Sequence, residues 1–162
     1  MSKELTSGDK APAFTATAVG GKFGDGAKVS LADFKGQTVV RYFYPKDDTP
    51  GCTTQACALR DEWCEFSGKA AIFGVSPDSA ASHAKFIQKH SLPFPLLVDD
   101  AKKIVGDYGV WVEKSMYGKK YMGTERTTFV IGADGKIKAI LRKVKPAEHT
   151  DLLRAALLKR AA

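Results

Sequence analysis

The chain has 162 residues, 44% hydrophobic and 27% charged, which suits one globular domain that we take to span residues 1–162. Its net charge is +7, but the 25 Lys and Arg residues are scattered in short groups such as Lys119-Lys120, unlike the basic stripe of a nucleic-acid interface. No apolar run is long enough to span a membrane, and no apolar stretch follows the first basic residues. We therefore expect a cytoplasmic protein that binds neither nucleic acid nor membrane.

The predicted elements begin with two strands around a glycine-rich turn. Residues 20–26 separate the strand-like residues 14–18 and 28–30, which predicts an N-terminal β-hairpin. β-Branched and aromatic runs then predict strands at residues 38–44, 71–76, 96–98, 127–131 and 136–141, the last two joined by an Asp134-Gly135 turn. Apolar spacing and cap residues predict helices at residues 52–66, 79–90, 101–108 and 148–159, with Ser76 and Ser79 as candidate caps of the second.

The last predicted helix is amphipathic, with Leu152, Leu153, Ala156 and Leu157 on one face. Alternating strands and helices followed by a hairpin and a helix are typical of an α/β protein with a mixed sheet. We predict a thioredoxin-like three-layer sandwich with a central mixed sheet and an N-terminal β-hairpin.

Three cysteines, Cys52, Cys57 and Cys64, lie within thirteen residues of one another. An odd number of clustered cysteines is a poor disulfide framework for a fold. In a reducing cytosol such a cluster indicates redox chemistry or metal binding instead.

Cys52 follows a strand and a loop and opens a helix, where unpaired N–H groups and the helix dipole favour a thiolate over a thiol. A thiolate can attack an oxygen–oxygen bond if the site stabilises the charge that develops on the departing oxygen. Thr49 is placed to hydrogen-bond a bound peroxide, and Arg126, one residue before a predicted strand, could polarise it. Pro45 would stiffen the loop and offer no competing N–H.

The pattern Pro45-x-x-x-Thr49-x-x-Cys52 resembles the active-site motif of the peroxiredoxins, and the residues around it resemble the Q-type, or bacterioferritin-comigratory, subfamily. The resemblance extends from about Gly8 to the last helix. It implies that Cys52 is the peroxidatic cysteine, that Thr49 and Arg126 activate the peroxide and that Pro45 shields the sulfur. Two positions depart from the usual subfamily pattern, with Gln55 in place of Glu and Leu59 in place of Phe, and we expect neither to affect the chemistry.

Attack on hydrogen peroxide or an organic hydroperoxide would leave Cys52 as a sulfenic acid, which a second thiol can condense to a disulfide. In a regular helix the Cα atoms of Cys52 and Cys57 would lie roughly 8–9 Å apart, beyond the usual disulfide limit of about 7 Å. A Cys52–Cys57 disulfide therefore requires the first helical turns to unwind. The resemblance agrees, since many subfamily members place a resolving cysteine five residues after the peroxidatic one.

The disulfide would need a dithiol reductant, and the resemblance and the exchange chemistry imply thioredoxin. Cys64 is too far along the helix to resolve Cys52, and we expect it to be a buried structural thiol. A resolving cysteine in the same helix makes a second subunit unnecessary, so we expect a monomer.

Other functions fit less well. A thioredoxin-type oxidoreductase would have Cys-x-x-Cys, and a zinc site would have paired Cys-x-x-Cys spacing, neither of which occurs. His83 and His90 are expected on a helix surface, too far apart to ligate one metal, and His149 is expected to be solvated. We expect no metal and no cofactor. A salt-dependent gel shift would distinguish a nucleic-acid-binding protein from the enzyme.

Overall fold

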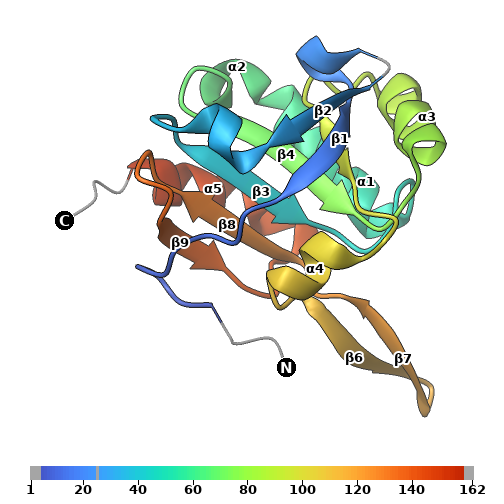
Figure 1. The fold of residues 1–162 in the computed structure, drawn as a ribbon. Coiled ribbons are helices and arrows are strands. Elements are labelled where there is room, and N and C mark those ends of the chain that lie inside the picture. Colours follow the sequence, from blue (N-terminus) through green and yellow to red (C-terminus); the bar gives the residue numbers. More distant parts are fainter. Residues whose placement is uncertain (1–4, 25, 159–162) are drawn as a thin grey trace.

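A seven-stranded mixed sheet is the framework of this computed structural model, which describes residues 5–24 and 26–158 (Figure 1). The strand order is β2-β1-β5-β4-β3-β8-β9. β3, β4 and β5 run parallel, while β1 lies antiparallel to β5 and β8 antiparallel to β3. The strands are β1 (Thr15–Val19), β2 (Ala27–Ser30), β3 (Val39–Phe43), β4 (Ala71–Ser76), β5 (Leu96–Val98), β8 (Thr127–Ile131) and β9 (Ile137–Leu141). The predicted mixed sheet and N-terminal hairpin are confirmed.

Helices cover both faces of this sheet. They are α1 (Pro50–Asp61), α2 (Trp63–Phe66), α3 (Ala80–His90), α4 (Lys103–Asp107) and α5 (His149–Leu158), with short 3-10 turns at Gly21–Phe23, Leu31–Phe34 and Pro146–Glu148. One core cluster includes Ile104 and Val105 of α4, and the other includes Leu59 of α1, Phe86 of α3 and Leu153 of α5. The α/β class predicted from the sequence is therefore confirmed. None of the described helices is long and apolar enough to cross a bilayer.

The inner strand β3 supplies side chains to both cores because successive residues of a strand point to opposite faces. Val39 and Phe43 pack with α4, whereas Val40 and Tyr42 pack with α1, α3 and α5. Every residue of β3 is buried, as expected for a strand with neighbours on both sides. This strand leads directly into the loop that carries the predicted active-site motif.

The helix after β3 differs from the prediction at both ends. It begins at Pro50, with Thr49 as the extended N-cap residue, so Cys52 is its third residue. Proline suits the first helical position because its φ angle is preset and its missing N–H would have no partner there. The helix does not continue to Phe66: Glu62, at φ −113 and ψ 18, interrupts it and a separate short helix follows.

The other predicted helices are present with shorter bounds. Ser79 caps α3 by accepting a hydrogen bond from Ser82 N, whereas Ser76 lies within β4. In α5 the predicted apolar face is partly wrong, because Leu153 is buried but Leu152 is 40% exposed. Residue 159, the predicted end of that helix, lies outside the described residues.

A second hairpin was not predicted. β6 (Trp111–Met116) pairs antiparallel with β7 (Lys119–Thr124) and projects from the body of the molecule (Figure 1). Tyr117 and Gly118 both have positive φ, at 52° and 78°, as the favoured two-residue hairpin turns require. These strands are rich in lysine and lack an apolar run, so hydrophobic patterning did not reveal them.

Candidate active site

Cys52 lies in the first turn of α1 and is only 2% exposed. N–H groups in this turn have no partner within the helix, and the helix dipole places partial positive charge there. The fold thus places the sulfur where the sequence predicted, at the end of the loop that leaves β3.

Arg126 contacts this sulfur directly. Its Nη2 donates to Cys52 Sγ at 3.4 Å, although the two residues are 74 positions apart. Arg126 lies between β7 and β8, and its carbonyl accepts a hydrogen bond from Val144 N at 2.9 Å. The structure therefore brings together two of the predicted site residues.

Gln55 holds the guanidinium in place, a role that the sequence analysis missed. Arg126 Nη1 donates to Gln55 Oε1 at 2.6 Å, and Gln55 is fully buried one turn after Cys52. We expected this departure from the subfamily pattern not to affect the chemistry, but the side chain contacts the predicted activating residue. The spacing of Gln55 from Cys52 on one helix was the signal that could have identified it.

Gly51 leaves room for the same guanidinium. A Cβ at this position would lie 3.2 Å from Arg126 Nη2 and 3.3 Å from Pro146 Cγ. Both contacts are tighter than ordinary van der Waals separations. A larger residue before Cys52 would therefore displace Arg126 or the turn at Pro146.

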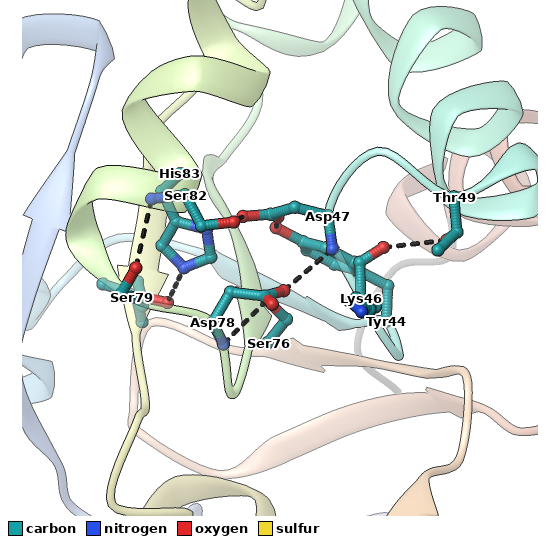
Figure 2. A network of polar contacts seen from close by, with 10 residues as sticks. Tyr44, Lys46, Asp47, Thr49, Ser76, Asp78, Ser79, Ser82 and His83 are labelled. Atoms are coloured by element: carbon teal, nitrogen blue, oxygen red, sulfur yellow. Dashed lines mark hydrogen bonds and ion pairs between the residues drawn. The ribbon is translucent and has the colours of Figure 1, made fainter.

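Thr49 and Pro45 are both half-buried in the loop before α1. Thr49 Oγ1 donates its hydrogen to Lys46 O at 2.8 Å (Figure 2). With that hydrogen committed, the hydroxyl oxygen can only accept a hydrogen bond from a bound molecule.

The three cysteines have different environments, and all are free thiols. Cys52 is buried, Cys57 is partly buried and Cys64 is exposed. The prediction of a buried structural thiol at Cys64 is therefore wrong. The interruption at Glu62 resets the helical face, so that Phe66 enters the core and Cys64 points to solvent.

A buried polar network fixes the loop just before Thr49 (Figure 2). Asp47 accepts hydrogen bonds from Tyr44 Oη at 2.6 Å and Ser82 Oγ at 2.8 Å, and its Oδ2 lies 2.7 Å from His83 Nδ1. The other ring nitrogen of His83 lies 2.8 Å from Leu97 O, so both nitrogens face acceptors. His83 is fully buried, and the prediction that it lies on a helix surface is wrong because the loop and β5 cover it.

Asp78 extends this network from the loop after β4. Its carboxylate accepts from Asp47 N at 2.8 Å and from Ser76 Oγ at 2.6 Å. Burial raises the pKa of Tyr44, and the adjacent Asp47 carboxylate raises it further, so the phenol stays a neutral donor. The loop backbone is thereby tied to the rigid sheet.

Further contacts tie both ends of α1 to α3. Before the helix, Asp48 pairs with Lys89 at 2.8 Å and lies 3.2 Å from His90, and hydrogen bonds from these two residues lower the Asp48 pKa. At its end, Arg60 Nη1 donates to His90 O at 2.7 Å. His90 is thus partly buried between the two ends of α1, and the expectation that it is an ordinary surface histidine is only partly met.

His149 is also buried, contrary to the prediction that it is solvated. Its Nε2 lies 2.9 Å from Thr128 Oγ1, and its ring lies beside that of Tyr42, with centroids 5.3 Å apart. Burial lowers the pKa of His149 to about 3, with a smaller effect from the positive charge of Arg126. The imidazole of His149 is therefore uncharged at pH 7.

Lys114 of β6 adds a second cation near the site. A groove of about 510 Å³ is lined by both Lys114 and Arg126. Partial burial lowers the Lys114 pKa, Arg126 lowers it further, and Cys52 acts in the opposite direction. Lys114 thus lies within electrostatic range of the sulfur.

Within residues 5–24 and 26–158, no group of three or more His, Cys, Asp or Glu side chains is arranged to hold a metal ion. The cationic, thiol-centred site at the start of α1 is instead suited to a substrate that gains negative charge as it reacts.

Known proteins are similar to this chain in sequence and in fold. The sequence profile of the AhpC/TSA family matches residues 7–140. The chain is 52% identical over 125 residues to Peroxiredoxin Bcp of Bacillus subtilis, covering 76% of this chain and 80% of that protein. It is 48% identical over 143 residues to a putative peroxiredoxin Bcp of Coxiella burnetii, covering 88% and 91%. A solved structure of the Xanthomonas campestris bacterioferritin comigratory protein, described for its alkyl peroxide reduction activity, superposes with a TM-score of 0.80 at 38% identity, over 89% of each chain.

Proposed function

Because this chain belongs to the AhpC/TSA family, in its Bcp and peroxiredoxin Q branch, we propose that it reduces hydroperoxides with Cys52 as the attacking thiolate. The supporting observation is the 3.4 Å contact between Arg126 Nη2 and Cys52 Sγ. A guanidinium at this distance stabilises negative charge on the sulfur and can polarise a bound peroxide. We propose both hydrogen peroxide and organic hydroperoxides as substrates, the latter supported by the activity described for the Xanthomonas relative.

In the first step the Cys52 thiolate attacks the terminal oxygen of ROOH. A sulfur–oxygen bond forms, the oxygen–oxygen bond breaks, and the electron pair leaves with RO⁻, which takes a proton to become ROH. Thr49 Oγ1, whose hydrogen is donated to Lys46 O, accepts the peroxide O–H and so orients the terminal oxygen toward the sulfur. Arg126 stabilises the charge that moves onto the departing oxygen. Pro45 shields the sulfenic acid that remains.

In the second step the Cys57 thiolate attacks Cys52 Sγ. A disulfide forms and the sulfenic hydroxyl leaves as hydroxide, which takes a proton from solvent to become water. Because a regular helix holds the two Cα atoms roughly 8–9 Å apart, the start of α1 must unwind first. Partial exposure of Cys57 is compatible with such an opening. Thioredoxin then reduces the disulfide by thiol–disulfide exchange. We propose that the protein works as a monomer in the cytoplasm.

The experiment that tests the assignment replaces Cys52 with serine. Cys52→Ser should abolish peroxide consumption, since a serine hydroxyl is not ionised at neutral pH and is a weak nucleophile. Cys64→Ser, which alters the exposed cysteine, is the matched control and should retain full activity. Peroxide consumption by each purified variant, followed with a dithiol reductant in excess, measures the effect.

Intact mass after one equivalent of peroxide supplies the second readout. The unsubstituted protein should lose two hydrogen atoms, and peptide mapping should give a Cys52–Cys57 link. Turnover by Cys52→Ser equal to that of the unsubstituted protein would overturn the proposed function.

A further inference from the structure

The β6–β7 hairpin carries four of the five large hydrophobic residues that are exposed in the part of the chain that the structure describes. Met116, Tyr117, Tyr121 and Met122 are 56%, 98%, 43% and 49% exposed, and Leu152 of α5, at 40%, is the other large exposed hydrophobic residue. A two-stranded hairpin alone is marginally stable in water, and clustered exposed apolar side chains mark interaction sites. This hairpin therefore has the character of a docking surface.

The register of the hairpin divides these residues between two faces. Lys114 lies opposite Tyr121 and Met116 opposite Lys119, and alternation places all four on one face, which we call the lysine face. The other face carries Met122 with Glu113 and Lys120. Tyr117 occupies the tip.

The two faces differ in charge. Lys120 Nζ lies 3.7 Å from Glu113 Oε1, so the second face is balanced. Among the described residues, neither Lys114 nor Lys119 has a hydrogen-bond or ion-pair partner. Glu125 and Cys52 act on Lys114 only at longer range. The lysine face therefore combines apolar side chains with two cations that lack a direct ion-pair partner in the described chain, which suits a partner that is apolar and acidic.

The lysine face also leads into the active site. Lys114 lines the groove that Arg126 lines, and its stem packs over Gly123, where a Cβ would lie 3.1 Å from Lys114 Cδ. From Lys114 to the tip of the hairpin is roughly 10 Å of strand. A protein bound to this face could therefore contact the first turns of α1 once they have unwound.

We propose that the lysine face (Lys114, Met116, Lys119 and Tyr121) docks the reductant, an acidic protein that carries its dithiol beside an apolar surface. A second copy of this chain suits the face less well, because it would bring two more uncompensated lysines and a net charge of +7. The inference rests on the proposed function, since it assumes that a protein dithiol reduces the Cys52–Cys57 disulfide.

The test compares substitutions on the two faces of the hairpin. Met116→Ser combined with Tyr121→Ser should lower kcat/KM for an acidic thioredoxin at least tenfold. Met122→Ser on the opposite face, and Leu152→Ser on α5, should leave it within twofold. All variants should keep the unsubstituted rate of Cys52 oxidation by peroxide and the unsubstituted turnover with dithiothreitol, which needs no docking surface.

Charge gives a second measurement. Raising the ionic strength should lower kcat/KM for thioredoxin. Lys119→Glu should lower kcat/KM at low ionic strength and make it less dependent on ionic strength. Equal effects on both faces, or no effect of the Met116 and Tyr121 substitutions, would overturn the docking surface while leaving the peroxidase intact. A dimer in sedimentation experiments that these substitutions dissociate would also overturn it, in favour of a second copy. Failure of Cys52 to react with peroxide would instead overturn the proposed peroxidase function. If the unsubstituted protein turned over with dithiothreitol but not with thioredoxin, both thioredoxin as the reductant and its docking on the lysine face would be rejected.

Discussion

The neutral side chain of Gln55 orients the Arg126 guanidinium toward the Cys52 sulfur. Gln55 Oε1 accepts from Nη1 at 2.6 Å while Nη2 faces Cys52 Sγ, so one turn of α1 presents both the sulfur and the group that orients its cation. Because the amide is uncharged, it fixes the direction of the guanidinium without cancelling the positive charge beside the sulfur. A glutamate here would bind Arg126 more strongly but would offset part of that charge.

Gln55→Leu should therefore slow peroxide attack. A hydrogen bond to a charged group contributes about 1.5–3 kcal/mol, so its loss should lower the second-order rate constant of Cys52 oxidation about tenfold or more. Gln55→Glu keeps an acceptor at the same place and should stay closer to the unsubstituted rate. Stopped-flow fluorescence with hydrogen peroxide measures both variants. A leucine variant as fast as the unsubstituted protein would show that Gln55 does not position Arg126.

His149 should make stability depend on pH. Its pKa is lowered to about 3 by burial, so between pH 3 and its ordinary value near 6.5 the unfolded chain binds a proton that the folded protein does not. The free energy of unfolding is then unaffected above pH 6.5 and falls as the pH decreases below it, by about 2 kcal/mol at pH 5 from this group.

His149→Gln removes the titrating ring but keeps a polar partner for Thr128. Urea unfolding at pH 7, 6 and 5 should show a smaller loss of stability for this variant than for the unsubstituted protein. Equal losses would show that His149 does not cause the pH dependence.

At the scale of elements, ion pairs and hydrogen bonds anchor both ends of α1, while the residues between them are held by Arg126 and by core packing. Before the helix, the Asp47 network and the Asp48 ion pairs hold the loop to α3. After it, Arg154 binds Glu62 at 2.8 Å and contacts Glu65, which ties the end of α1 to α5. Cys52 and Cys57 both lie in the segment between these anchors.

Unwinding on oxidation should therefore be confined to residues 49–59. Hydrogen exchange followed by mass spectrometry should show protection lost there after one equivalent of peroxide, with residues 44–48 and α3 still protected. Loss that spreads into α3, or identical exchange in both redox states, would contradict this boundary.

Cys57→Ser provides the control for this experiment. The variant should form the Cys52 sulfenic acid, detectable with a sulfenic-acid reagent, yet keep its helical protection and lose thioredoxin-supported cycling. Unchanged cycling would identify another resolving thiol.

At the scale of the whole molecule, a cation that is unpaired in the described part of the chain lies inside the sheet, at Arg41 of the inner strand β3. It is fully buried, and none of its guanidinium nitrogens has a hydrogen-bond partner among the described residues. Its Cζ lies 3.2 Å from the ring centroid of Phe14, and burial lowers its pKa to about 10. Stacking on an aromatic ring offsets only part of the desolvation of a buried cation.

Arg41→Met should consequently stabilise the protein, by on the order of 1–3 kcal/mol, because methionine fills similar space without a charge. Lys28→Met on the exposed edge strand β2 is the control and should change stability by less than about 0.5 kcal/mol. Urea denaturation measures both. A destabilised Arg41→Met variant would mean that the stacked guanidinium contributes more than its desolvation costs.

Local sequence determined the strands of the main sheet and the main helices in their order, the hairpin around Asp134-Gly135 and the place of Cys52 at the start of a helix, but not the β6–β7 hairpin. These features depend on backbone preferences and apolar spacing within a few residues. The single domain, the monomer, the cytoplasmic location and thioredoxin as reductant stay predictions, as do the roles of Cys52, Cys57, Thr49, Arg126 and Pro45.

Tertiary structure alone decided which polar side chains are covered and by what. His83 and His149 are buried because the active-site loop and distant strands lie over them, while Cys64 is exposed because a helix ends early at Glu62. The orientation of Arg126 by Gln55 likewise joins residues 71 positions apart. Burial and long-range hydrogen bonding depend on segments brought together only by folding, so no local pattern in the chain records them.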